Sequence, residues 1–285
     1  MDRGFAPAKI NLALHVTGRR ADGYHDLDSL VVFAGAGDQL TVLPATTLSL
    51  SVTGPFAEGV PAGEDNLVLR AARALARARQ VEKGATIRLA KMLPHAAGIG
   101  SASADAAAAI RLLASFWGVE PLAPDDPEVL ALGSDVPACL MAPRPLRMRG
   151  RGEAIEPLPP LPACGLVLVN PGVPVPTAAV FAALGPAAGD PLPPLPEAPD
   201  AEGLAAWIGQ TRNDLQPPAE TLAPPVTEAL ALLRRQPGVL AATMSGSGGT
   251  CVGITRDIGT ARRAARALQI ARQGWWVAPA PLLAA

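Results

Sequence analysis

Hydrophobic and polar side chains alternate at the start of the chain, which predicts a β-strand. Within residues 5–17 the alternation begins at Ile10, and its period of two is typical of a strand with one exposed face. Lys9 and Asn11 are expected to be accessible on that face, and His15 is a further candidate for it. Glycine and proline residues then separate three further expected strands, at 28–33, 38–43 and 47–53.

Helical patterns begin in the middle of the chain. Their expected positions are a helix over 67–80, a strand over 85–90, a long helix that ends near Trp117, and two short helices that begin after Pro124 and Ser134. These segments predict mixed α and β structure in the first half.

The second half has a regular order of elements. The expected elements are a buried strand over 165–170, helices over 203–209 and 218–235, strands over 239–243 and 250–255, a helix over 258–271 and a last strand over 275–278. The order strand, helix, strand, strand, helix, strand predicts an α+β sandwich similar to a ferredoxin-like unit.

Residues 185–200 are rich in proline and interrupt this pattern. Proline lacks the N–H group that helices and central strands need, so we expect an exposed, semi-rigid loop. A polyproline ligand for a partner protein is the alternative, and a loop particular to this lineage is favoured.

Composition narrows the class of protein. The chain has 285 residues, of which 49% are hydrophobic and 17% charged, enough for one large or two ordinary domains. A net charge of -1 argues against a nucleic-acid-binding protein. No apolar run is long enough for a membrane span, and no secretory leader is apparent, so we expect a cytoplasmic protein without membrane contact.

Cysteines and arginines add little chemistry by themselves. Cys139, Cys164 and Cys251 lack metal-ligand spacing, so buried reduced thiols are expected and no zinc site is expected.

Arginines occur at 144, 147, 149 and 151, and the alternation over 147–151 puts the last three on one face of a strand. A solvated strand edge is favoured there over an anion site.

The stretch from Pro94 to Asp105 has the strongest functional signal. Its small residues lead directly into an alanine-rich helix, whose first N–H groups and dipole would point at one place that suits a phosphate. The alternative is a helix that follows a tight turn and is capped by Ser101 or Ser103. A second glycine loop at 245–249 could likewise approach an anion or simply connect two strands.

Four other side chains have two interpretations each. Lys9 is one of only three lysines, and its ammonium could steady a phosphoryl group or pair with a buried carboxylate. Asp135 could cap a short helix or accept a proton from an alcohol. Tyr24 and His25 could contact the ring of a ligand or form an exposed turn.

Seven motifs in order resemble the GHMP small-molecule kinases. They are Pro7 to Leu12, Arg20 to His25, Pro94 to Ala104, Gly133 to Pro137, Asn170 to Gly172, Arg212 to Leu215 and Met244 to Gly248. The segment Arg-Ala-Asp-Gly-Tyr-His favours, within the family, a kinase for a cytidyl diphosphate sugar alcohol over mevalonate or homoserine kinases.

The resemblance implies a two-domain α+β fold. Residues 1–158 would form an N-terminal ATP-binding domain, similar to domain 2 of ribosomal protein S5, and 159–285 a ferredoxin-like C-terminal domain. The implied reaction transfers the γ-phosphoryl group of ATP, with Mg²⁺, to the 2-hydroxyl of 4-diphosphocytidyl-2-C-methyl-D-erythritol, in non-mevalonate isoprenoid precursor synthesis.

The resemblance also implies roles for single residues. Asp135 would be the catalytic base and Lys9 its charged partner, while Asn11, Tyr24, His25 and Thr177 would contact the substrate. ATP would be bound by Pro94, His95, Ala96, Ala97, Gly98, Ile99, Gly100, Ser101, Ala102, Ser103, Gly246, Ser247 and Gly248. No residue is assigned to the metal, and a monomer or weak dimer is expected.

Alanines at 96, 97, 102 and 104 depart from the glycine-rich and serine-rich loop of the family. Alanine keeps the N–H donor but narrows the allowed φ, so a positive φ at these positions would be strained. Two alternatives therefore stand beside the implied activity: a GHMP kinase for another small alcohol, and a catalytically silent ligand-binding module on the same fold.

Overall fold

The computed structural model describes residues 2–185 and 189–283, which form two compact units of mixed α and β structure. The first unit contains the N-terminal segment up to Ala8, Gly37–His95 and Gly100–Ala142. The second contains Lys9–Ala36, Ala96–Ile99 and the chain from Pro143 onward. Strands β1 (Asp2–Arg19) and β2 (His25–Ala45) contribute residues to both units.

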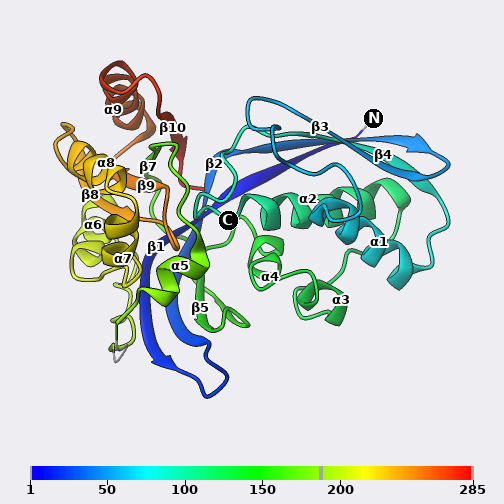
Figure 1. The fold of residues 1–285 in the computed structure, drawn as a ribbon, viewed down its shortest axis with the longest axis horizontal. Helices are drawn as coiled ribbons and strands as arrows, with labels where there is room; N and C mark the ends of the chain where they lie inside the picture. The colour runs from blue at the N-terminus through cyan, green and yellow to red at the C-terminus, as the bar shows by residue number, and fades with distance from the viewer. Residues whose placement is uncertain (1, 186–188, 284–285) are drawn as a thin grey trace. The chain divides into compact units, whose positions relative to one another are not determined.

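In the first unit, helices pack on one another beside strands that belong to a six-stranded sheet. Its further elements are β3 (Leu48–Thr53), α1 (Leu67–Arg79), β4 (Gly84–Ala90), α2 (Ser101–Trp117), α3 (Pro127–Leu130) and α4 (Val136–Leu140). Strand β4 pairs in parallel with β3 and antiparallel with the second half of β2. Helix α2 packs against α1 and α4 (Figure 1), and its buried alanines permit this close approach.

The second unit contains a four-stranded antiparallel sheet. Its further elements are β5 (Leu146–Gly150), β6 (Ala154–Pro157), β7 (Gly165–Asn170), α5 (Thr177–Ala182), α6 (Ala201–Gly209), α7 (Gln216–Leu222), α8 (Pro225–Arg234), β8 (Val239–Met244), β9 (Cys251–Thr255), α9 (Ile258–Ala271) and β10 (Trp276–Pro281). The strand order β10-β7-β9-β8 confirms the expected ferredoxin-like arrangement. Helices α8 and α9 pack on this sheet and bury its apolar face (Figure 1).

Three expected elements differ from those observed. The strands expected at 28–33 and 38–43 form the single strand β2. Gly37 does not break it, because a Cβ at this position would lie 2.3 Å from the Ala6 carbonyl oxygen and the glycine instead admits a neighbouring backbone. The helix expected over 218–235 is split into α7 and α8, since Pro224 and Pro225 end the first and begin the second.

The proline-rich segment is largely exposed from Asp190 to Asp200, as expected, except that Leu192 is buried. Residues 186–188 of this expected loop lie outside the described residues.

Among the described residues, no helix has both the length and the apolar character that a membrane crossing requires. The three cysteines are buried, as expected. The division at residues 158 and 159 into two family domains remains a prediction, and it differs from the division into compact units.

Candidate active site

Strand β1 carries Lys9 and Asn11 into the interior of the second unit. Their exposed fractions are 5% and 4%. Lys9 Nζ donates to Asn11 Oδ1 at 3.3 Å, and Asn11 Nδ2 donates to Ser29 Oγ at 2.7 Å. The amide of Asn11 therefore orients the ammonium of Lys9, and the expectation that both side chains are accessible is wrong in this structure.

Two glycine loops that are distant in sequence pack on each other in the same unit. Ser245 Oγ donates to the Gly98 carbonyl at 2.8 Å, and the Thr250 N–H donates to the Ala97 carbonyl at 3.1 Å. Gly98 has a φ of +72°, and a Cβ there would lie 2.4 Å from the Ser245 carbonyl oxygen. Only glycine fits at this contact.

Strand β1 also joins this contact, because the Asn11 N–H donates to Ser245 Oγ at 3.0 Å. The 245–249 loop therefore does more than connect two strands. It braces the 96–99 segment of the expected phosphate loop against the strand that carries Lys9.

Asn213 fixes the second loop from its other side. Its amide donates to the carbonyls of Met244 and Gly246, both at 2.8 Å, and it accepts from the Leu215 N–H at 3.0 Å. Thr177 Oγ1 lies 2.7 Å from Ser247 Oγ. These contacts give a structural role to the Arg212 to Leu215 motif, for which the sequence indicated no role.

Among the alanines that depart from the family's glycine-rich and serine-rich loop, Ala96 has a strained backbone conformation. This residue has a φ of +52°, in the left-handed region that an L-residue seldom adopts. Ala97 is not among the residues with positive φ. The strain expected for the alanine-substituted loop is therefore present at Ala96.

In the first unit, helix α2 begins without a side-chain cap. Its N-cap is Gly100, with a φ of +58°, and no side chain accepts a capping hydrogen bond. The alternative that Ser101 or Ser103 caps the helix is wrong, since neither side chain accepts such a bond. The Ser101 hydroxyl instead donates to Asp38 Oδ2 and accepts from the Lys91 ammonium. The first N–H groups of the helix lack intrahelical partners, which suits an anion.

A buried charged cluster holds this helix start. Lys91 is 2% exposed, and its ammonium donates to Asp105 Oδ2 at 2.7 Å and to Asp38 Oδ2 at 2.5 Å. Asp38 also accepts from the N–H groups of Met92 and Leu93. The cluster thus ties the chain that enters the phosphate loop to the first two turns of α2.

Burial raises the pKa of Asp105 to about 8, with the charge of Asp38 adding to this and that of Lys91 opposing it. Asp105 Oδ1 is buried without a hydrogen-bond partner. Sequence reasoning missed this cluster, although the scarcity of lysine in the chain marked Lys91 as well as Lys9.

Asp135 stands at the N-cap of α4, but its side chain accepts no capping hydrogen bond. Asp126, at the N-cap of α3, does accept one from the Glu128 N–H, at 2.9 Å. The helix-cap alternative for the Asp135 carboxylate is therefore wrong.

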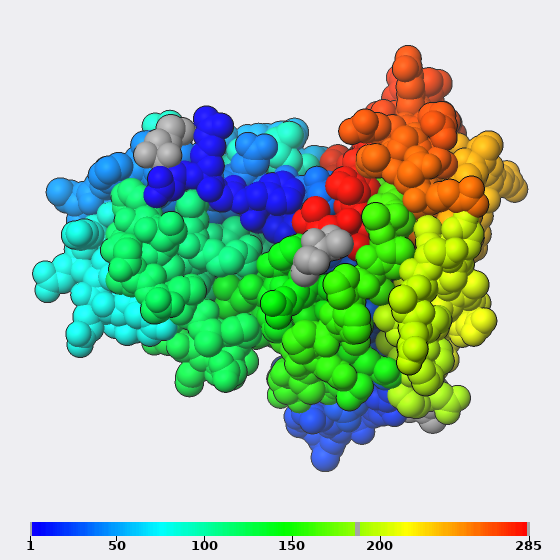
Figure 2. Space-filling view, turned by 180° about the vertical axis from the view of Figure 1, so that it is seen from behind, coloured from blue at the N-terminus to red at the C-terminus, as the bar shows by residue number. Residues whose placement is uncertain are grey.

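The β1–β2 hairpin carries Tyr24 and His25 near its tip. Tyr24 is 54% exposed, and the Arg151 guanidinium lies 3.7 Å from the centre of its ring. The His25 ring stacks on Phe181, with 5.3 Å between ring centres and 24° between planes. Figure 2 shows the hairpin, in blue at the lower edge, projecting beyond the green segments that surround it. Sequence reasoning missed Phe181 because helix α5 was not expected.

The other histidines have structural or exposed positions. His15 is buried, with Nδ1 hydrogen-bonded to the Asp190 carbonyl and Nε2 accepting from the Arg212 N–H. His95 is exposed. Among the described residues, no group of three or more histidine, cysteine or acidic side chains could hold a metal ion.

Both halves of the chain match known family models. Residues 66–142 match the N-terminal domain of GHMP kinases, and 195–272 match the GHMP kinase C-terminal model.

Similar proteins cover nearly the whole chain. A 4-diphosphocytidyl-2-C-methyl-D-erythritol kinase of Paramagnetospirillum magneticum is 56% identical over 98% of this chain and 97% of its own. One from Cereibacter sphaeroides is 54% identical over 99% and 100%. A crystal structure of a 4-(cytidine 5'-diphospho)-2C-methyl-D-erythritol kinase superposes with a TM-score of 0.81, at 34% identity and 98% coverage of both chains. The chain therefore belongs to the GHMP kinase family, as its seven ordered motifs indicated.

Proposed function

We propose that this chain phosphorylates the 2-hydroxyl of 4-diphosphocytidyl-2-C-methyl-D-erythritol with ATP, which yields the 2-phosphate and ADP for isoprenoid precursor synthesis. The observation that carries the proposal is the aromatic pair of Phe181 with His25, the residue next to Tyr24 in the sequence, in a chain that matches kinases of that name over 98% and 99% of its length. Aromatic faces of this kind suit a nucleobase.

Asp135 is the proposed base. Its carboxylate accepts the proton of the 2-hydroxyl while the hydroxyl oxygen bonds to the γ-phosphorus and the bond from that phosphorus to the β–γ bridging oxygen breaks. Lys9 is the proposed charged partner that stabilises the transferring group. The two residues belong to different units, and their pairing is part of the proposal.

ATP is the phosphoryl donor of GHMP kinases, and its phosphates are proposed to bind at Pro94 to Ser103 and at Gly246 to Gly248. Support comes from the uncapped start of α2 and from the packing of Gly98 on the second loop. Backbone N–H groups at such a start bind phosphate oxygens without any charged side chain.

Tyr24 and His25 are proposed to bind the cytosine, with Phe181 as the platform behind His25. Thr177 is proposed to contact the substrate from the first turn of α5, where its hydroxyl meets Ser247. Asn11 is proposed to act on the substrate mainly by orienting the ammonium of Lys9, because its own amide is hydrogen-bonded to Lys9 and Ser29.

Mg²⁺ is proposed to enter with ATP. The orphaned Oδ1 of Asp105 does not fit a metal site built from protein alone, because the Lys91 ammonium lies against the same carboxylate and opposes a cation. In phosphoryl-transfer sites magnesium is bound largely by phosphate oxygens and water. The ion would supply charge neutralisation of the phosphates, and no protein ligand is assigned to it.

An ADP-release assay with a panel of alcohols tests the proposal. The cytidyl substrate should be turned over, while methylerythritol phosphate, homoserine and mevalonate should be poor substrates, since the recognition elements address the cytidine end. Efficient turnover of one of these three would assign another GHMP activity to the chain. Absence of ADP release with every alcohol, although ATP binds, would indicate a silent binding module.

Three further features remain predictions within this proposal. They are the domain boundary near residue 158, a cytoplasmic location, and a monomeric or weakly dimeric state.

A further inference from the structure

Three arginines form a row beside the β1–β2 hairpin. Arg147 and Arg149 alternate along β5, and Arg151 follows in the turn to β6. Strand β5 pairs antiparallel with the start of β2, in a register that puts Arg149 opposite Asp28. We call Arg147, Arg149 and Arg151 the arginine row.

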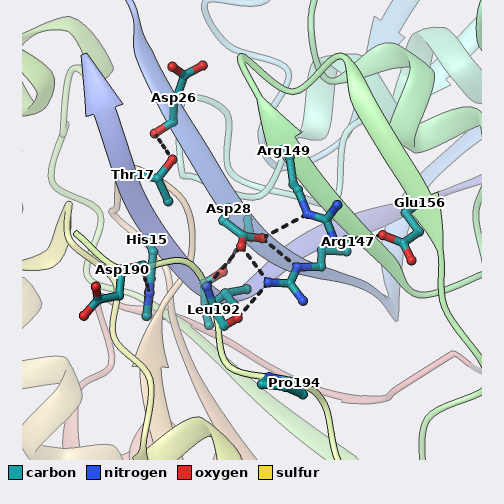
Figure 3. Close-up of polar contacts among 12 residues, drawn as sticks. His15, Thr17, Asp26, Asp28, Arg147, Arg149, Glu156, Asp190, Leu192 and Pro194 are labelled. Carbon is teal, nitrogen blue, oxygen red and sulfur yellow. Dashed lines mark hydrogen bonds and ion pairs between the residues drawn. The ribbon is translucent and has the colours of Figure 1, made fainter. Parts of the chain in front are cut away.

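At its buried end, the row makes a two-point ion pair with Asp28. Arg147 Nε donates to Asp28 Oδ1 at 2.8 Å and Nη2 donates to Oδ2 at 2.6 Å (Figure 3). Asp28 is 2% exposed. Burial alone would raise its pKa, but hydrogen bonds from Arg147 and the Leu192 N–H, with the charges of Arg147 and Arg149, lower it. The solvated edge expected from sequence is therefore wrong for Arg147.

The same ion pair fastens the proline-rich segment. Within 191–196 only Leu192 and Leu195 have backbone N–H groups, because every other residue is proline. The Leu192 N–H donates to Asp28 Oδ2 at 3.0 Å, and its carbonyl accepts from Arg147 Nη2 at 2.7 Å. Figure 3 shows Leu192 bound at this one point.

Two more side chains fasten the segment on either side of Leu192. His15 of β1 hydrogen-bonds the Asp190 carbonyl through Nδ1 at 2.8 Å, and Trp207 of α6 donates to the Pro194 carbonyl at 3.0 Å. His15 Nδ1 must donate here, since a carbonyl can only accept and Nε2 already accepts from the Arg212 N–H. Through His15 of β1 and Asp28 of β2, the segment is hydrogen-bonded to both strands of the hairpin at its base.

At its exposed end, the row contacts the hairpin tip. Arg151 covers one face of the Tyr24 ring, while Arg20 pairs with Asp26 at 2.9 Å and with Glu153 at 3.6 Å. Arg149 lies between the two ends, 2.9 Å from Glu156 and 4.0 Å from Asp28. The row thus follows the hairpin from the buried base to the tip that carries Tyr24 and His25.

We propose that the arginine row and the proline-rich segment fastened to it position this hairpin for recognition of the nucleoside end of the substrate. Arg147 and Arg151 are positioning residues for selectivity. This inference rests on the proposed function, because it assigns the base-binding role to Tyr24 and His25. Its physical basis is that a two-stranded hairpin holds its shape poorly alone, so recognition side chains at its tip need support.

The first test replaces Arg151 by alanine. Loss of the contact with the Tyr24 ring should raise the KM for the cytidyl substrate about threefold to tenfold, with kcat and the KM for ATP nearly unchanged. R151K should recover part of the loss. The matched control is R144A, an exposed arginine just before β5 and outside the row, which should leave both KM values unchanged.

The second test loosens the base of the hairpin. Single replacement of Arg147 leaves Asp28 buried without its cation and could prevent folding, so both charges are removed together in D28L/R147M. An apolar pair of similar volume keeps the packing but leaves Leu192 without its partners. The melting temperature should fall by only a few degrees, because Leu192 loses its two hydrogen bonds while no charge is left unpaired, and the KM for the cytidyl substrate should rise while that for ATP does not.

A third readout needs no activity. Tyr24 is the only tyrosine of the chain, so ring-labelled tyrosine gives one NMR signal that reports its surroundings. R151A and D28L/R147M should shift or broaden that signal, and R144A should not. If neither variant changes the signal or the KM for the cytidyl substrate while the wild type is active, the positioning proposal is overturned and the proposed function stands. If the wild type is inactive with the cytidyl substrate, the proposed function fails, and the tyrosine signal alone then supports or overturns the positioning of Tyr24.

Discussion

Strand β1 and the hairpin that it begins hold candidate site residues in two different ways. At one end, Lys9 and Asn11 are almost fully buried: Lys9 donates to Asn11, and Asn11 in turn donates to Ser29 and Ser245. At the other, Tyr24 is 54% exposed with the Arg151 guanidinium over its ring, and the ring of His25 stacks on Phe181. The buried end therefore has one permitted geometry, whereas the exposed end tolerates small shifts.

This difference matches the demands of the proposed reaction. Phosphoryl transfer depends on placement of charge to within a fraction of an ångström, while a nucleobase is bound by stacking, which is less directional. Mutations at the buried end should consequently affect turnover or folding, and those at the exposed end should affect substrate affinity.

The largest effect is expected at Asp135. D135N retains the shape of the side chain but removes the charge that accepts the proton, so kcat should fall roughly 10²-fold to 10⁴-fold with ATP affinity little changed.

The matched control for D135N is D126N, at the N-cap of α3, where asparagine keeps a good cap and activity should be unchanged. Turnover of D135N within about threefold of the wild type would exclude Asp135 as the base, since general-base catalysis typically contributes far more.

The next effect is expected at Gly98. G98A should destabilise the chain by about 1–3 kcal/mol, because the added Cβ would meet the Ser245 and Gly248 carbonyls and φ is positive. A96G, two residues away in the same loop, relieves the left-handed strain of Ala96 and should be neutral or stabilising by up to about 1 kcal/mol.

Chemical denaturation measures the free energy of unfolding of both variants, and ATP titration shows whether the loop still binds the nucleotide. Equal stability of G98A and the wild type would show that the two glycine loops do not pack as tightly as the buried end of the comparison requires.

Tyr24 should show the affinity effect of the exposed end. Y24A should lose about 1–3 kcal/mol of binding to the cytidyl substrate, the usual contribution of one stacked base, without losing ATP. Y24F keeps the ring and should bind nearly as the wild type does.

Inhibition by free nucleotides checks the same site, since CMP should compete with substrate better than UMP, whose base edge differs. Equal inhibition by both nucleotides would mean that the base edge is not recognised at this end.

The smallest effect is expected for the buried cluster of Lys91, Asp38 and Asp105 at the start of α2. Burial raises the pKa of Asp105 above its unfolded value of 3.8 to about 8, so the folded state binds the proton more tightly. This contribution to stability is fully present below about pH 4 and is lost as the pH rises towards 8. D105N, which resembles the protonated carboxyl, should gain at least about 1 kcal/mol relative to the wild type between pH 5 and 8.5.

Denaturation curves at both pH values measure this difference. A wild type and a D105N variant that change in parallel between pH 5 and 8.5 would contradict the raised pKa of Asp105.

Much of the fold could be predicted because its signals are local. Alternation over 5–17, the small-residue start of α2 and the order of elements after residue 165 each depend on short windows of sequence. The expected strand over 165–170 and the helix over 258–271 coincide with β7 and α9. Errors occurred where packing overrode a local signal, as at Gly37, where a glycine admits a neighbouring backbone instead of ending the strand.

The candidate site was only partly predictable for the same reason. Lys9, Asp135, Tyr24 and His25 were proposed from motifs, and their roles remain predictions. Phe181 and the Lys91 cluster were missed because their partners are remote or lie in elements with weak patterns. The arginine row was noticed, but its spacing alone could not distinguish a solvated edge from a support for the hairpin.

The sequence by itself was enough to predict the family, the α+β class and the position of both glycine loops. Tertiary structure decided which of these residues meet. Ser245 reaches Gly98 across 147 positions of sequence and Asn11 across 234, and Asp28 meets the Leu192 N–H across 164. Such contacts leave no trace in any local window, because each depends on two segments that only the folded backbone brings within hydrogen-bonding distance.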